Sequence, residues 1–188
     1  MAFPLGYVAT LATVQAAGNA VAATTTQTSL LTGGASQALC TLPANWIEHV
    51  GQQFNIKASG IISTPVATQG NLTLSVVFNT TPINVAVSPS FTSLANQTNI
   101  TWRLDWDLTV RAVGSGTSSN FIHTGEFRSA LVSLTSELNL IPASAPVVGT
   151  GYNSTTANTV DLQATWSNST AGNTITLYQY ALTSLINY

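Results

Sequence analysis

Two aspartates separated by one residue, Asp105 and Asp107, are the most direct candidates for chemistry in this chain. In a β-strand both side chains would point to the same face, with about 6.6 Å between the two Cα atoms. That separation falls near the spacing of the two carboxylates in inverting glycosidases. Carboxylate oxygens are also ligands of Ca²⁺, although this ion needs six or more oxygen ligands and only two carboxylates are evident here.

Two arginines lie on the same predicted strand face as this pair, Arg103 on one side and Arg111 on the other. Nearby positive charges favour ionised carboxylates, whereas a glycosidase needs one carboxyl group that holds a proton. We therefore interpret Arg103, Asp105, Asp107 and Arg111 as a structural ladder of ion pairs, formed across strands or between subunits. These four residues are the candidate interface.

Proton transfer could otherwise involve only Glu48 with His49, or His123 with Glu126, next to a hydroxyl such as that of Ser59. The sequence contains no G-x-S-x-G nucleophile motif. Two histidines are too few for an imidazole metal site, and a single cysteine excludes an intrachain disulfide. We predict no catalytic, cofactor-binding or metal-binding residue, and we expect His123 to be a strand residue that hydrogen-bonds a neighbouring Ser or Glu.

Aromatic side chains could form a platform that stacks against sugars, as in carbohydrate-binding modules. Most of the tryptophans fall on the apolar phase of predicted strands, which favours a core position: Trp102, Trp106 and Trp166. The aromatic residues left to face outward are Trp46, Tyr178 and Tyr180. These three are the candidate sugar contacts under the alternative of a carbohydrate-binding module.

The element that must position the charged residues is a long β-strand over residues 99–113. Its even positions are apolar and its odd positions are polar, and successive strand side chains point to opposite faces. The turn residues 114–117 and the apolar residues that follow predict a hairpin with a return strand near 121–134. Further strands are predicted at 29–31, 54–62, 71–78, 158–166 and 174–182.

The composition of the chain restricts its function. Only 5% of the 188 residues are charged, compared with about 25% in ordinary globular proteins. Soluble monomers normally stay dispersed through mixed surface charge, so the composition favours an assembly subunit, with an extracellular adhesive domain as the rival. A net charge of -2 and a single lysine provide no basic stripe for nucleic acid.

The N-terminal segment is apolar, but it lacks the Lys or Arg of a signal peptide, and polar residues interrupt it too often for a membrane span. We expect residues 1–28 to form an arm that reaches a neighbouring subunit, with a short helix around residues 10–22. Residues 29–188 would form the folded domain, and deletion of the arm should leave that domain folded. The uneven spacing of the strands predicts an all-β fold, a two-sheet antiparallel jelly-roll sandwich.

The C-terminal region resembles the ending of small jelly-roll virion proteins of tailed bacteriophages. The similarity covers the alternating strand 160–166, the Ser-Asn-Ser-Thr-Ala-Gly-Asn turn and the strand at 174–176, in roughly the last thirty residues. In the segment Tyr178-Gln179-Tyr180 the chain departs from the pattern, which has a small or imidazole-bearing residue before the Gln. The resemblance implies a structural role without catalysis, in capsid decoration proteins or fibre heads built from three jelly rolls.

From these observations we expect a non-enzymatic virion subunit, a homotrimer that cements the outside of a bacteriophage capsid. Its partners would be further copies of itself and the major capsid protein, with no cofactor, no direct nucleic-acid contact and no membrane. The alternatives are a tail or fibre component of the phage and a carbohydrate-binding β-sandwich module.

Overall fold

The computed structural model describes residues 7–14, 16–31, 39–79, 82–131 and 138–186. The described residues form two antiparallel β-sheets that pack as a sandwich, which confirms the all-β, two-sheet prediction. They form no helix, and so none that could span a membrane.

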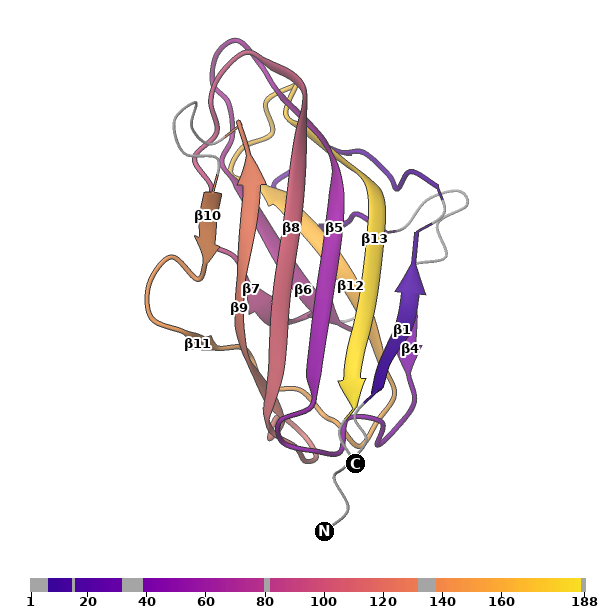
Figure 1. Ribbon diagram of the computed structural model, residues 1–188. Helices are drawn as coiled ribbons and strands as arrows, with labels where there is room; N and C mark the ends of the chain where they lie inside the picture. The colour runs from indigo at the N-terminus through magenta and orange to yellow at the C-terminus, as the bar shows by residue number, and fades with distance from the viewer. Residues whose placement is uncertain (1–6, 15, 32–38, 80–81, 132–137, 187–188) are drawn as a thin grey trace.

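Sheet A is the larger layer, and Figure 1 shows it in front. Its order is β1 (Tyr7–Thr13), β13 (Thr174–Ile186), β5 (Gln53–Thr64), β8 (Gln97–Ala112), β9 (Asn120–Ser129) and β10 (Leu138–Ile141). Two short strands join it from the side, β2 (Val21–Ala22) on β13 and β11 (Val147–Val148) on β9.

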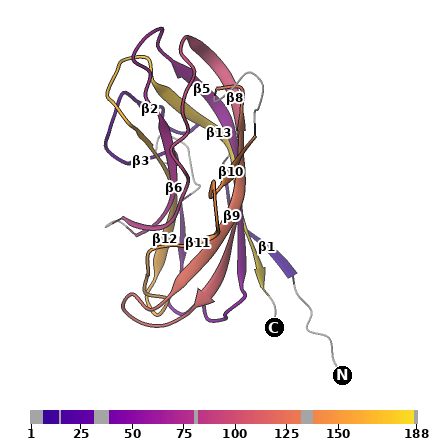
Figure 2. The ribbon, with the colours of Figure 1, turned by 90° about the vertical axis from the view of Figure 1, so that its left-hand side faces the viewer.

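Sheet B is the second layer, and Figure 2 shows the two layers from the side. Its order is β3 (Thr28–Ser29), β12 (Asn158–Trp166), β6 (Leu72–Phe78) and β7 (Ile83–Val87), with β4 (Cys40–Leu42) also on β12. The core lies between the sheets and includes the inward side chains of both.

The strand β8 has the alternation that its sequence predicts. From Trp102 to Val110 every even residue is buried, and every odd residue is exposed or half-buried. The predicted hairpin is also present, because β8 pairs antiparallel with β9 from Trp102 to Ala112. Alternation over so many residues fixes the register, since a slip of one residue would move each apolar side chain into solvent.

Three tryptophans occupy the core as predicted, and each has an exposed fraction of 0%. Their indole N–H groups all have acceptors. Trp102 Nε1 donates to the carbonyl oxygens of Ile61 and Thr176, and Trp166 Nε1 donates to the carbonyl oxygen of Val21. Trp106 Nε1 donates to His123 Nδ1. A buried indole N–H usually needs such a partner. Each of these bonds therefore links a tryptophan ring to another segment of the chain.

The N-terminal segment pairs with the sandwich where the structure describes it, and the helix expected around residues 10–22 is wrong for these residues. The reach of this segment to a neighbouring subunit stays a prediction. Residues 7–13 form β1, which pairs with β13, and Val21 is a buried core residue. The backbone of residues 14–24 also bonds to Tyr180 and Leu177 in sheet A and to Trp166 in sheet B. The open edge of β13 offers hydrogen bonds that a helix would not use, and such tertiary context overrides weak helix propensity.

Candidate functional site

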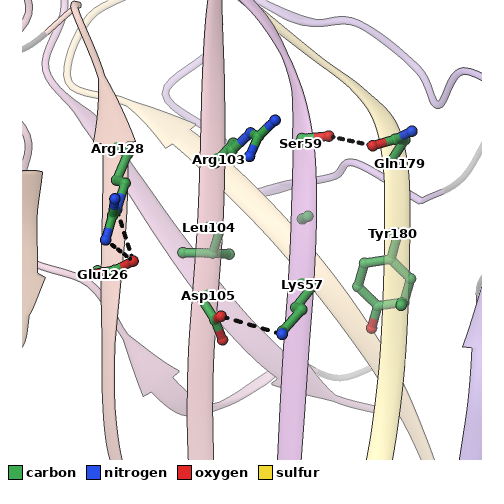
Figure 3. A pocket seen from close by; sticks show the side chains of 11 residues that line it. Lys57, Ser59, Arg103, Leu104, Asp105, Glu126, Arg128, Gln179 and Tyr180 are labelled. Atoms are coloured by element: carbon green, nitrogen blue, oxygen red, sulfur yellow. Dashed lines mark hydrogen bonds and ion pairs between the residues drawn. The ribbon is translucent and has the colours of Figure 1, made fainter. Parts of the chain in front are cut away.

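The charged residues gather on the outer face of sheet A. This face carries seven of the ten Lys, Arg, Asp and Glu residues of the chain: Lys57, Arg103, Asp105, Asp107, Arg111, Glu126 and Arg128. They come from β5, β8 and β9, which lie side by side. A depression of ≈ 590 Å³ lies among them and extends to Gln179 of β13 (Figure 3).

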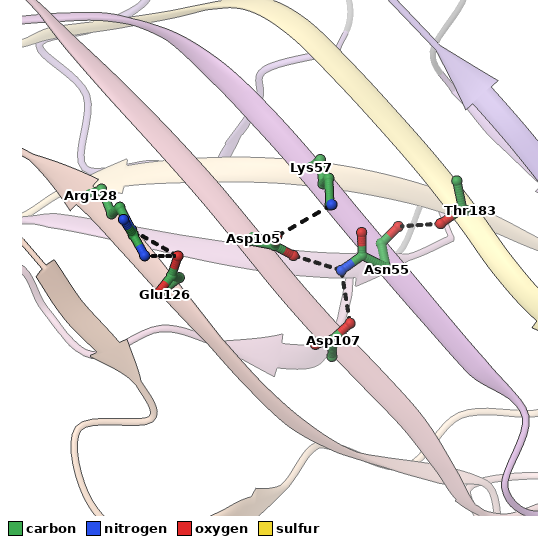
Figure 4. Close-up of polar contacts among 7 residues, drawn as sticks. All are labelled: Asn55, Lys57, Asp105, Asp107, Glu126, Arg128 and Thr183. Carbon is green, nitrogen blue, oxygen red and sulfur yellow. Dashed lines mark hydrogen bonds and ion pairs between the residues drawn. The ribbon is translucent and has the colours of Figure 1, made fainter.

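The two aspartates of β8 are held by residues of β5. Asn55 Nδ2 donates to Asp105 Oδ1 at 2.6 Å and to Asp107 Oδ1 at 2.8 Å. Lys57 Nζ lies 3.6 Å from Asp105 Oδ2 (Figure 4). The pairing register explains these contacts, because Asn55 lies opposite Asp107 and Lys57 lies opposite Asp105. One amide and one amine therefore bind the carboxylate pair from the neighbouring strand.

The arginines of the predicted ladder lie on the expected strand face, but they form no ion pair with the aspartates within the described chain. Arg103 and Arg111 share the outer face with the aspartates, but within the described ranges neither has an acidic group at ion-pair distance. Instead Arg128 of β9 pairs with Glu126, with Nη2 at 2.7 Å from Oε1 and Nε at 2.8 Å. This bond and the charge of Glu126 raise the pKa of Arg128. Lys57 and Asp105 form a cross-strand ion pair between β5 and β8, whereas the Arg128–Glu126 pair lies within β9.

Two of the three candidate sugar contacts do not form an exposed platform. Tyr178 is exposed, but Tyr180 has an exposed fraction of 4% and lies in the core. Trp46 is half-buried and packs on Phe54, with 5.7 Å between the ring centroids. For Tyr180 the prediction is wrong, and burial raises the pKa of its hydroxyl.

A β-bulge in β13 is the reason for the burial of Tyr180. Leu177 pairs with Gly60 and Gln179 with Ser59, so Tyr178 is an extra residue in the register. Tyr178 and Gln179 are both exposed, and the inward phase changes from Leu177 to Tyr180. Strict alternation cannot reveal such an insertion, because a bulge shifts the phase of every later residue.

The candidate proton-transfer groups lie apart. His123 is buried in the core, where its Nδ1 accepts a hydrogen bond from Trp106 Nε1 at 3.2 Å, and not from a Ser or Glu as expected. Glu126 and Ser59 point to the outer face, and the exposed His49 pairs with Glu48 at 3.4 Å. The described part of the chain holds no group of three His, Cys, Asp or Glu residues placed to share a metal ion.

Burial lowers the pKa of His123 below its ordinary value. The unfolded chain therefore binds a proton at this residue more readily than the folded chain. The contribution of neutral His123 to the free energy of unfolding should be complete above a pH of about 6.5. It should decline as the pH falls, by at most about 1.4 kcal/mol per pH unit for one proton. Equilibrium urea unfolding between neutral and mildly acidic pH measures this slope.

The matched variants are His123→Gln, which keeps an acceptor for Trp106 Nε1, and His49→Gln at an exposed position. His123→Gln should flatten the slope of stability against pH, and His49→Gln should leave it unchanged. If the slope of His123→Gln equals that of the wild type, another group causes the pH dependence.

Sheet B contains a buried carboxyl group that was not predicted from the sequence, that of Asp161. Ser29 Oγ donates to its Oδ1 and Gln163 Nε2 donates to its Oδ2, both at 2.7 Å. No Lys, Arg or His of the described ranges forms an ion pair with it. Burial raises the pKa of Asp161, and the hydrogen bonds only partly oppose this shift. Asp161 lies on the polar phase of a predicted strand, so the sequence pattern did not indicate that its side chain would be buried.

We predict that Asp161→Asn stabilises the protein at neutral pH. A raised pKa means that the folded state binds the proton more tightly, so stability is complete below the ordinary pKa and falls as the pH rises. The amide carries no charge and can still accept from Ser29. Gln163 Oε1, buried without a partner in the described structure, can accept from the new amide after a flip. The melting temperature at pH 7 should rise, and the gain should shrink in acid.

The comparison for this prediction is Asp161→Ala, which removes both hydrogen bonds and should lower the melting temperature. A lower melting temperature for Asp161→Asn at pH 7 would mean that the buried charge is a net stabilising group.

Comparison with known proteins adds no assignment. No protein-family model matches the chain, and no curated protein matches its sequence. The molecule is thus defined by its own architecture, an antiparallel two-sheet β-sandwich with a charged outer face on one sheet.

Proposed function

We propose that the chain is a non-enzymatic structural subunit of a virus particle, a decoration protein that stabilises the head of a tailed bacteriophage. The observation that carries a structural role is the distribution of charge. Away from the outer face of sheet A, Glu48 is the one exposed Lys, Arg, Asp or Glu in the described ranges. So uncharged a surface suits a protein that meets neighbours over much of its area.

The strand order supports a jelly-roll topology for this sandwich. We take β1, β3, β5, β6, β7, β8, β12 and β13 as its eight strands in chain order. In one sheet the first strand then pairs with the last, the last with the third, and the third with the sixth. In the other sheet the second pairs with the seventh, the seventh with the fourth, and the fourth with the fifth. Two Greek keys of a jelly roll give this order, with β9, β10 and β11 as an extension of one sheet.

The bacteriophage assignment rests on the resemblance of the C-terminal strands and turn to virion proteins. The mechanism of such a protein is passive. It binds across joints between shell subunits on the outside of the capsid, and a ligand that binds only the assembled lattice stabilises that lattice by mass action. Its partners would be the major capsid protein and two further copies of itself.

A sugar-binding role has less support, because a stacking platform needs several exposed rings. Of the three candidate contacts only Tyr178 is exposed, and Tyr180 is buried. The other alternative is a tail or fibre component of the same virus particle. Such a component would be present in few copies, whereas a decoration protein would be present in many.

Electron microscopy of particles from the virus that encodes the chain tests the proposal. A decoration protein should appear in many copies on the outer shell, and particles without it should lose their DNA at a lower temperature than intact ones. Few copies at the tail would favour a fibre or tail component. Absence of the chain from purified particles would overturn the virion role.

A further inference from the structure

The charges on the outer face of sheet A are not balanced within one chain. Lys57 compensates Asp105, and Arg128 compensates Glu126. Three charged groups remain, Arg103, Arg111 and Asp107. Asp107 accepts a hydrogen bond from Asn55 but has no cation at ion-pair distance in the described structure.

The surroundings of Arg103 supply more donors than acceptors. Arg103 lies directly opposite Arg128 in the β8–β9 register, and like charges at such positions repel. On its other side Ser59 Oγ donates to Gln179 Oε1 at 3.0 Å, which leaves the Gln179 amide N–H without an acceptor among the residues described. The depression beside Arg103 thus offers a guanidinium and an amide N–H as donors (Figure 3). A carboxylate from outside the chain fits these donors.

We infer that Arg103 of one copy binds Asp107 of a second copy, and that this contact joins the subunits of the homo-oligomer. The inference rests on the proposed assembly role and names its surface. The two residues lie on one strand, about 13 Å apart at the rise of an extended chain. The chain therefore carries both halves of an ion pair at separate points of the same exposed face.

A second copy fits this face because the unbalanced groups are of both signs. An acidic partner would neutralise Arg103 but would repel Asp107, whereas a further copy supplies the opposite charge to each. The exposed apolar side chains of Leu138 and Leu140 lie opposite Arg128 and Glu126 at the edge of the face, and Tyr178 follows on the other side. They add apolar area next to the charged centre.

Sedimentation velocity on the full chain tests the contact with Arg103→Glu, Asp107→Arg and the double variant, at low salt and at about 1 M salt. The wild type should self-associate at low salt and dissociate at high salt. Each single reversal should weaken association by about tenfold or more, because it creates a like-charge contact. The double variant restores opposite charges and should recover most of the affinity.

The control is Glu48→Lys, a charge reversal of the same size in an exposed loop, which should leave association unchanged. Thermal unfolding shows whether each variant is folded. Association that resists both single reversals, or that the double variant fails to recover, would overturn the contact. A wild type that stays monomeric would overturn it as well, even where electron microscopy finds the chain on particles, since the partner of Arg103 would then be another protein.

Discussion

Deletion of residues 1–22 is expected to abolish the cooperative unfolding of the sandwich. The deletion removes β1 and β2, and with them the strand that covers the open edge of β13. It also removes Val21, whose carbonyl oxygen accepts the indole N–H of Trp166. A buried donor left without an acceptor costs about 1–3 kcal/mol on its own.

The segment that follows β1 makes this effect larger than the loss of one edge strand. Val14 N donates to the carbonyl oxygen of Tyr180, and Gly18 N donates to that of Leu177, both in sheet A. Val21, farther along the same segment, accepts the indole N–H of Trp166, which belongs to sheet B. The chain therefore crosses from one sheet to the other and closes that side of the core. Net stabilities of domains are about 5–15 kcal/mol, so loss of this closure should leave no folded state to melt.

Circular dichroism against temperature and urea measures the outcome. Two point variants give graded controls in the full chain: Val21→Ala should cost about 2 kcal/mol through two lost methyl groups and the resulting cavity. Val8→Ala, at an exposed position of β1, should cost less than 0.5 kcal/mol. A truncated chain that still melts cooperatively near the wild-type temperature would favour the view of this segment as an arm.

Local periodicity was sufficient for the regular strands. β12 has the predicted bounds of 158–166, and β8 differs from the predicted 99–113 by two residues at most. In both strands the apolar phase continues without interruption and includes tryptophans, so burial on one face follows from the residues alone. The charged face was predictable for the same reason, because the odd positions of β8 must point away from the core.

The partners across that face were not predictable. Lys57 and Asn55 also lie on the polar phase of a predicted strand, but their contact with the aspartates depends on which strands are neighbours and in which register. One sequence contains no direct signal for either. The pairing of β1 with β13 was not predictable for the same reason. Its two strands lie near opposite ends of the chain, so no local pattern indicates that they are neighbours.

The bulge in β13 depends on a residue in the neighbouring strand, Gly60 of β5. Gly60 lies between Trp102 of β8 and Leu177 of β13, at the position where the β13 register shifts. A Cβ atom at Gly60 would overlap the carbonyl oxygen of Thr176, which accepts the indole N–H of Trp102. The backbone of β13 can approach β5 this closely only because residue 60 has no side chain.

Gly60→Ala should therefore destabilise the protein by about 3 kcal/mol, at the upper end of the usual cost of overpacking, because a backbone atom must move and not a flexible side chain. The displacement would also weaken the Trp102 hydrogen bond and disturb the phase that buries Tyr180. Urea unfolding gives the free energy, and amide hydrogen exchange in β13 should show the loss of protection on both sides of Tyr178.

Ser59→Ala is the control: it removes one hydrogen bond, to Gln179, and should cost about 1 kcal/mol or less. If Gly60→Ala is no less stable than Ser59→Ala, the bulge does not need glycine opposite it, and the burial of Tyr180 must be enforced from the core side, by its own packing.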